Sequence, residues 1–249
     1  MPTSRRCAGR VHRVLEPEQQ LISVVVPAFD EERTIEEVVR RVAGAGLHAE
    51  IIVVDDGSRD GTAAVLAGLD GEIEGLRTLV QPVNRGKGAA VRVGIAASKG
   101  DVVVIQDADL EYDPKDLPTL LGPLLEGRAD VVYGTRLRGG EPQRAHLFWH
   151  YAGNRFLSLL TNVLYNTTIS DMEVGYKAFR GDLIRSLDLV SDDFRFEPEV
   201  TAKILRTPGV RLFEVPISYY GRTFEEGKKI TWRDGIKAVG ALLRFRFLR

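Results

Sequence analysis

The stretch Ile22-Ser-Val-Val-Val26, followed at once by Pro27, decides the fold class. Its β-branched residues do not alternate with charged ones, which is typical of a strand buried on both faces of a sheet. Runs of the same apolar character recur further along the chain, at Glu50–Val54, Leu76–Val80, Val102–Ile105 and Asp130–Tyr133. Each run is short and is bounded by turn-forming residues, so we expect five buried strands up to Tyr133.

Segments with helical spacing separate these strands, at Glu31–Ala43, Ala63–Leu69, Lys87–Ala97 and Lys115–Leu125. Alternation of buried strands with helices predicts an α/β fold, with a mainly parallel central sheet and helices on both faces. After Gly140 the alternation of short strands and helices ends. We expect a long helix over Ala145–Tyr165, then mixed elements and a strand at Leu212–Val215.

Length and composition limit the classes of protein. The 249 residues suffice for one large α/β domain, and the net charge of -1 argues against a dedicated nucleic-acid binder. A single cysteine, Cys7, excludes a disulfide framework and a cysteine-based zinc site, and suits a reducing compartment. No stretch approaches the roughly 20 apolar residues of a membrane span, and the basic start of the chain is not a secretory signal. We expect a basic disordered leader over residues 1–20, one domain over 21–230, and a location on the cytoplasmic side of the membrane.

Residues 222–249 are strongly basic, with eight Lys or Arg against three Asp or Glu. Over 231–249 we expect a basic amphipathic helix, because apolar residues fall on one helical stripe at Ile236, Val239, Leu243 and Phe247. Such a helix can lie in the interface of an anionic membrane. The alternative is a terminal helix that docks on the core while its arginines face water.

Polar and acidic residues follow three predicted strands, at Pro27–Glu31, Asp55–Ser58 and Asp107–Glu111. Ligands of an open α/β sheet bind at the carboxyl ends of the strands, so these segments mark the expected site. The run Asp55-Asp56-Gly57-Ser58 is either a simple turn or a carboxylate that accepts hydrogen bonds from a base or ribose. No dinucleotide glycine pattern and no GxxxxGK[ST] loop is present.

The acidic run Asp107-Ala-Asp109-Leu-Glu111 spaces its carboxylates two residues apart, so an extended segment would place them on one face. Neighbouring carboxylates repel each other unless a cation lies among them. Mg²⁺ or Mn²⁺, bound by one or two carboxylates and substrate phosphates, would remove that repulsion. The alternative is a solvated turn that caps the helix starting near Asp113-Pro114.

In this order the motifs resemble the catalytic domain of glycosyltransferase family 2, which has the GT-A fold. The resemblance covers residues 22 to about 225 and rests on Val-Val-Val-Pro27-Ala-Phe-Asp-Glu31-Glu, Val-Asp55-Asp56-Gly-Ser58-Arg-Asp-Gly-Thr62, Asn84-Arg-Gly-Lys-Gly88 and Asp107-Ala-Asp109-Leu-Glu-Tyr-Asp-Pro114. Within the family the chain is most similar to the dolichyl- or polyprenyl-phosphate mannose or glucose synthases. That similarity rests on Gly134-Thr-Arg136, Asp171-Met-Glu-Val-Gly175-Tyr-Lys-Ala-Phe179 and Phe196-Glu197-Pro-Glu199.

The resemblance implies roles for particular residues. The donor nucleotide would be bound by Pro27, Phe29, Glu31, Asp56, Lys87, Asp107, Ala108 and Lys229, and the metal by Asp109 and Glu111. Asp171 matches the acid/base position of relatives, while Arg136 and Arg222 would stabilise the leaving diphosphate. A phosphate acceptor has a second pKa of about 6 and is largely ionised, so Asp171 would orient it rather than remove a proton. The alternative is a carboxylate that caps the turn over residues 170–173.

The implied activity is metal-dependent, inverting transfer of a hexose from GDP-mannose or UDP-glucose to a polyprenyl or dolichyl phosphate. We expect the enzyme to be peripheral at the cytoplasmic face, held by the amphipathic segment or by a separate membrane-anchoring subunit, and to bind no nucleic acid. The basic, glycine-punctuated segment 219–230 is either a loop that closes over the diphosphate or a surface hairpin. Two other functions remain: the same donor chemistry on a soluble or glycan hydroxyl, and non-catalytic nucleotide binding.

Overall fold

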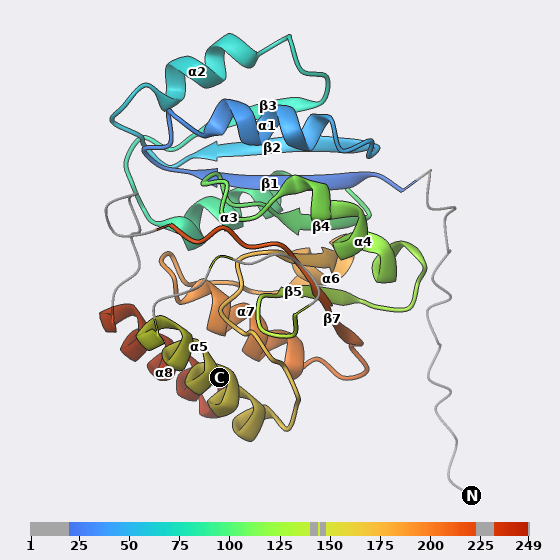
Figure 1. Cartoon of the computed structure of the whole chain (residues 1–249), viewed down its shortest axis with the longest axis vertical. Helices are drawn as coiled ribbons and strands as arrows, with labels where there is room; N and C mark the ends of the chain where they lie inside the picture. The colour runs from blue at the N-terminus through green and yellow to red at the C-terminus, as the bar shows by residue number, and fades with distance from the viewer. Residues whose placement is uncertain (1–19, 140–143, 145–147, 223–231, 249) are drawn as a thin grey trace, which may run out of the picture.

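The computed structural model describes residues 20–139, 144, 148–222 and 232–248. Seven strands form one sheet in the order β3-β2-β1-β4-β6-β5-β7 (Figure 1). They are β1 (Ile22–Ala28), β2 (Ala49–Asp55), β3 (Leu76–Val80), β4 (Val102–Ile105), β5 (Val131–Thr135), β6 (Lys177–Arg180) and β7 (Leu212–Pro216). All pairings are parallel except those of β6, which runs antiparallel to β4 on one side and to β5 on the other. The predicted α/β class and mainly parallel sheet are confirmed.

Helices cover both faces of this sheet. They are α1 (Ile35–Ala43), α2 (Thr62–Leu69), α3 (Lys87–Ala97), α4 (Leu117–Leu125), α5 (Phe148–Tyr165), α6 (Gly181–Ser186), α7 (Phe196–Leu205) and α8 (Trp232–Phe247). On β2, Ile51 and Val53 belong to the main core with α1, whereas Ile52 and Val54 pack with Ala90 of α3 on the other face. Burial on both faces explains why β2 reads as a continuous apolar run rather than an alternating one.

The strand β6 and the helices α6 and α7 were not predicted from the sequence. β6 reads Lys-Ala-Phe-Arg and begins with Lys177, a charged residue that is fully buried. The ammonium of Lys177 donates to the carbonyl oxygens of Met172 and Val174 and pairs with Glu197 of α7. Because these partners satisfy it, a lysine can occupy the middle of the sheet, where sequence patterns predict an apolar residue.

The C-terminal helix docks on the domain, as the second of its two predicted arrangements requires, and its predicted membrane contact stays a prediction. Ala238, Ala241 and Leu242 are buried where α8 packs on α5 and α7, and the Tyr165 hydroxyl donates to the Leu242 carbonyl at 2.8 Å. Ile236, Leu243 and Phe247, three of the four residues of the predicted apolar stripe, are nevertheless exposed. The helix is therefore docked on the domain and still presents apolar side chains outward. Among the described residues no helix has the length and hydropathy needed to cross a membrane. The predicted leader, 1–20, lies outside the described residues except for Gln20.

Candidate active site

A pocket of about 400 Å³ opens at the carboxyl ends of β1, β2, β4 and β5. Its wall includes most of the predicted site residues: Pro27, Phe29, Glu31, Asp56, Lys87, Asp107, Ala108, Asp109, Glu111, Arg136 and Arg222. Asp171 does not line it, and Lys229 lies outside the described residues. The volume is in the range of small-molecule sites, and strands far apart in sequence supply its residues.

Asp56 positions the loop that precedes α3. Its Oδ1 accepts hydrogen bonds from Gln81 Nε2 at 2.8 Å and from the amide of Arg85 at 2.9 Å, and its Oδ2 accepts from the amide of Gly86 at 2.7 Å. Gly86 has a φ of 104°, a backbone conformation that favours glycine. The predicted nucleotide-binding carboxylate thus also shapes this wall of the pocket.

The backbone at the start of α3 packs closely against the segment Ser191–Asp193. A Cβ on Gly88 would lie 2.4 Å from the carbonyl oxygen of Ser191, and the amide of Ala89 donates to the carbonyl of Asp192 at 3.0 Å. Lys87 is the residue near the start of α3 that places a charged side chain in the pocket wall. Its Nζ lies 2.7 Å from Asp107 and 3.5 Å from Glu197. Burial alone would lower the pKa of Lys87, but these two carboxylates outweigh burial and raise it, so the side chain is a cation.

The acidic loop after β4 is bound to the segment Tyr219–Arg222. Glu111 accepts hydrogen bonds from the Tyr219 hydroxyl at 2.7 Å and from the amide of Arg222 at 2.8 Å. The Arg222 guanidinium donates to the carbonyl of Asp109 at 3.0 Å and to the carboxylate of Glu31 at 3.0 Å. Residues about 110 positions apart in the chain therefore form one rim of the pocket.

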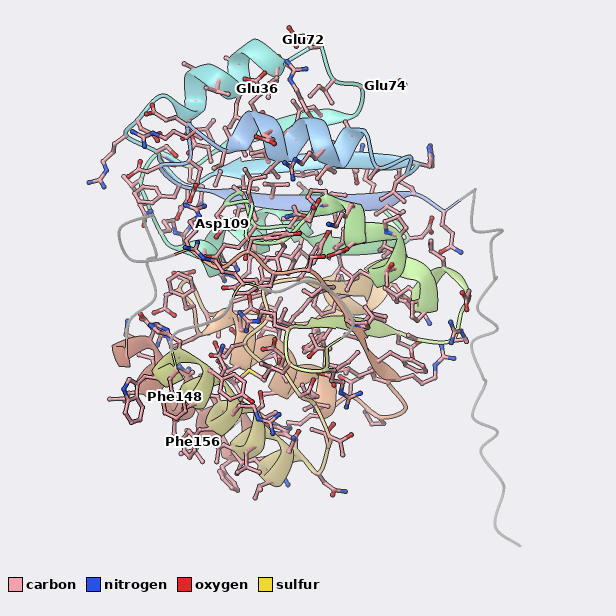
Figure 2. All side chains as sticks on the ribbon, viewed as in Figure 1. Glu36, Glu72, Glu74, Asp109, Phe148 and Phe156 are labelled. Atoms are coloured by element: carbon pink, nitrogen blue, oxygen red, sulfur yellow. The ribbon has the colours of Figure 1, made fainter. Side chains whose placement is uncertain are left out.

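The acidic loop offers one carboxylate that is available for a metal ion. Within the described residues, no group of three or more His, Cys, Asp or Glu is arranged to hold a metal. Both oxygens of Glu111 already accept hydrogen bonds. Asp109, which is labelled in Figure 2, lines the pocket with a side chain that is 28% exposed. Its Oδ1 accepts one hydrogen bond, from the amide of Glu111 at 3.1 Å, and its Oδ2 lies 3.7 Å from Nη2 of Arg222. Mg²⁺ needs only one or two protein carboxylates when substrate phosphates complete its coordination, so Asp109 fits this role. Direct ligation by Glu111 stays a prediction.

Arg136 lines the pocket and forms a bidentate ion pair with Asp171, which lies behind it. Nε and Nη2 of Arg136 each lie 2.7 Å from an oxygen of Asp171, whose side chain is fully buried. Burial would raise the pKa of Asp171, but Arg136 outweighs it and lowers the pKa below its usual value. The guanidinium also lies 5.0 Å from the centre of the Tyr219 ring. This arrangement favours orientation of Arg136 by Asp171 over proton removal by Asp171.

Several pocket residues were not predicted as site residues. Glu173 and Glu197 line the wall and come from two of the three motifs that carry the narrower family resemblance. His150, Tyr151 and Asn154 show that the first turns of α5 also line the pocket. The only signal for them in the sequence was their place inside those motifs or on the long helix, because their neighbours come from distant strands.

Comparisons with known proteins show the family to which this sequence is related. A family model described as glycosyl transferase family 2 matches residues 23–187. The undecaprenyl-phosphate mannosyltransferase of Micrococcus luteus is 30% identical over 219 residues, which are 83% of this chain and 86% of that protein. The dodecaprenyl-phosphate galacturonate synthase of Rhizobium johnstonii is 29% identical over 214 residues, which are 83% of this chain. The match spans 61% of the galacturonate synthase, less than two thirds of its length.

A solved structure has the same fold. Glucosyl-3-phosphoglycerate synthase from Mycobacterium tuberculosis, in complex with Mn²⁺, uridine diphosphate and phosphoglyceric acid, superposes with a TM-score of 0.73. The superposition covers 93% of this chain and 80% of that one, at 24% sequence identity. The GT-A architecture expected from the sequence is thereby confirmed.

Proposed function

This chain belongs to glycosyl transferase family 2, and on that premise we propose that it transfers a hexose from a nucleotide sugar to a polyprenyl phosphate. The donor is GDP-mannose or UDP-glucose, and the transfer is a single displacement that inverts the anomeric carbon. The named functions of the mannosyltransferase and the galacturonate synthase support a lipid-phosphate acceptor. The observation that carries this proposal is that α5 lines the pocket on one side and exposes apolar side chains on the other.

One side of α5 lines the pocket and the opposite side is an exposed apolar stripe. His150 and Asn154 face the pocket, whereas Phe148, Trp149, Phe156, Leu159 and Val163 are 57–81% exposed. Phe148 and Phe156 are labelled on α5 in Figure 2. At 100° per residue these five side chains fall within an arc of about 100°. An apolar stripe that wide is ordinarily buried, so it marks a contact surface. A lipid tail held at this stripe would leave its phosphate within reach of the pocket.

The neighbouring helix α8 adds basic charge and further apolar surface. It packs beside α5 at the same end of the molecule (Figure 1) and exposes Ile236, Leu243 and Phe247 together with Lys237, Arg244 and Arg246. Basic side chains next to exposed apolar ones suit an anionic membrane interface. We therefore assign α5 and α8 to a peripheral contact with the cytoplasmic face of the membrane.

Chemistry at the pocket is the displacement of a nucleoside diphosphate. A Mg²⁺ or Mn²⁺ ion, when held by Asp109, supplies Lewis-acid neutralisation of the leaving diphosphate. Arg222, fixed to the loop of Asp109, and Arg136, oriented by Asp171, place cationic donors beside the same pocket. Because the acceptor phosphate is largely ionised at neutral pH, the chain needs to position it rather than deprotonate it.

The proposal is tested by transfer from radiolabelled GDP-mannose or UDP-glucose in detergent micelles that contain undecaprenyl phosphate. We expect label in the organic phase only when the lipid phosphate and Mg²⁺ or Mn²⁺ are both present, and strongly reduced label with Asp109→Asn. Transfer to a water-soluble hydroxyl in place of the lipid would support the alternative acceptor class. Binding of the nucleotide sugar without transfer to any acceptor would leave only the non-catalytic function.

A further inference from the structure

Glu173 is a pocket carboxyl that the proposed transfer does not use. It lies in the loop between Asp171 and β6 and lines the pocket, and its Oε1 is buried without a hydrogen-bond partner among the described residues. A buried polar oxygen without a partner is unfavourable, because it has given up its hydrogen bonds to water and gained none in the protein. Such an atom in a native protein calls for an explanation, and one that lies in a pocket wall can be satisfied by a bound ligand.

The described part of the pocket wall is acidic, because its carboxyl groups outnumber its cations by seven to three. The cations are Lys87, Arg136 and Arg222. The carboxyl groups are those of Glu31, Asp56, Asp107, Asp109, Glu111, Glu173 and Glu197. Each cation already faces another carboxylate: Lys87 faces Asp107, Arg136 faces Asp171, and Arg222 faces Glu31. An ionised Glu173 would add a negative charge to this wall.

The groups that face Glu173 come from four elements. They are Glu197 on α7, Lys177 on β6, Arg136 after β5, and Asp171 on its own loop. Lys177 is paired with Glu197, so the cations near Glu173 are matched by other carboxylates. Burial, and then the charge of Glu197, raise the pKa of Glu173 to about 7. The neutral acid is therefore well populated at neutral pH.

We propose that Glu173 binds substrate as a carboxylic acid, donating its O–H to a phosphate oxygen in the pocket. The inference rests on the proposed function, which brings a diphosphate and a lipid phosphate to this site. An ionised carboxylate would repel either group, whereas the protonated form is a hydrogen-bond donor. The proton comes from solvent and forms the O–H bond of the carboxyl group, and no bond of the phosphate ligand breaks or forms. Glu173 thereby couples phosphate binding to the uptake of a proton.

This coupling fixes the sign of the pH dependence. Above a pKa of about 7, binding must first protonate Glu173, so affinity for the phosphate ligand falls by up to tenfold for each pH unit. Between pH 6.0 and 8.5 the dissociation constant should rise by up to about 30-fold relative to that of Glu173→Gln. The glutamine variant cannot ionise, so it provides the reference that removes the titration of the ligand itself.

The test is isothermal titration calorimetry at pH 7.5 in two buffers of different ionisation enthalpy, which counts the protons taken up. One arm uses UDP or GDP with Mn²⁺, and the other uses undecaprenyl phosphate in detergent without nucleotide. We expect proton uptake in at least one arm, lost in Glu173→Gln, and the arm that shows it identifies the phosphate. The matched control is Glu74→Gln, at an exposed glutamate that is labelled in Figure 2. His150→Gln removes the histidine of the pocket wall and so tests whether that residue takes up the proton instead.

Proton uptake by Glu173→Gln equal to that of the wild type in both arms would overturn the assignment. Should the glutamine variant fail to fold, carbon-13 NMR of the glutamate carboxyls in the wild type decides the question. A glutamate signal with a midpoint near 7 supports the proposal, and titration of every glutamate near the ordinary value of about 4.3 refutes it. Absence of nucleotide binding by the wild type, in contrast, would refute the proposed function itself.

Discussion

Arg136 stands between Asp171 and the pocket, and binds both oxygens of that carboxylate through Nε and Nη2 at 2.7 Å each. The backbone amide of Arg136 also donates to Asp171 Oδ2 at 3.0 Å. A carboxylate with three such donors and no exposed surface is a poor proton acceptor, because protonation would leave a buried guanidinium without its counter-charge. The pair fixes a cation in the pocket wall.

Substitution Asp171→Asn should therefore destabilise the fold as well as reduce turnover. Removing one partner of a buried ion pair costs about 3–5 kcal/mol, because the other charge remains buried. Urea denaturation of the wild type and the variant measures this difference. A variant with wild-type stability and no turnover would instead favour for Asp171 the acid/base role that its position has in relatives.

Substitution Asp109→Asn should reduce turnover without loss of stability. Its side chain is 28% exposed at the pocket, and the ion pair that the substitution weakens, with Arg222 at 3.7 Å, is long and partly exposed, so it contributes little to stability. We expect turnover to fall by at least about 100-fold, equivalent to about 3 kcal/mol of lost stabilisation of the leaving diphosphate. Asp70→Asn, on an exposed helix end, is the control. Near-normal turnover in a folded Asp109→Asn protein would remove Asp109 from the metal site.

Membrane contact should depend on the exposed stripe of α5. The double variant Trp149→Ser, Phe156→Ser removes two side chains that are 81% and 57% exposed, so the fold should be little affected. We expect weaker co-sedimentation with anionic liposomes, because the apolar contribution to interfacial binding is lost. Val80→Ser, on a strand at the other end of the sheet, is the control. Equal sedimentation of all three proteins would contradict the membrane contact of α5.

Helix α8 cannot be deleted without damage to the core. Leu242 is fully buried against the domain, and its truncation in Leu242→Ala should lower the free energy of unfolding by about 2–5 kcal/mol. Exposed Leu243→Ala is the matched variant on the same helix and should cost far less. Thermal unfolding of the two proteins compares them directly. Comparable losses in both would show that the helix is not docked as described.

Stability should also fall with rising pH through the titration of Glu173. Its pKa rises from an ordinary 4.5 to about 7 on folding, so the folded state binds more protons than the unfolded state between these values. Stability from this group is fully present below pH 4.5 and is lost as pH approaches 7. Denaturant unfolding of Glu173→Gln across this range should lack that decline. An identical pH profile in the wild type and the variant would contradict it.

The sequence predicted the first half of the fold well because apolar β-branched runs such as Val102–Ile105 are buried on both faces and follow one another with helices between them. It failed at β6, where buried Lys177 is stabilised by partners that only the tertiary structure brings together. The pocket residues at strand ends were predictable from the topology rule, whereas Glu173 was not. Its raised pKa depends first on burial in the folded pocket wall and then on the charge of Glu197, 24 positions away.

The position of β6 has a consequence for how the chain folds. In the described sheet β6 is the strand that connects β3-β2-β1-β4 to β5-β7, by pairing with β4 through Val102–Ile105 and with β5 through Val131–Tyr133. Because β5 is made before β6, it has no ladder to the earlier strands until residue 177 and those after it emerge from the ribosome. Pairing of β4 with β6 joins residues that are more than 70 positions apart, and contacts between such distant residues form slowly. Completion of the sheet at β6 should therefore be a late folding event, and it should couple the stability of β3-β2-β1-β4 to that of β5-β7.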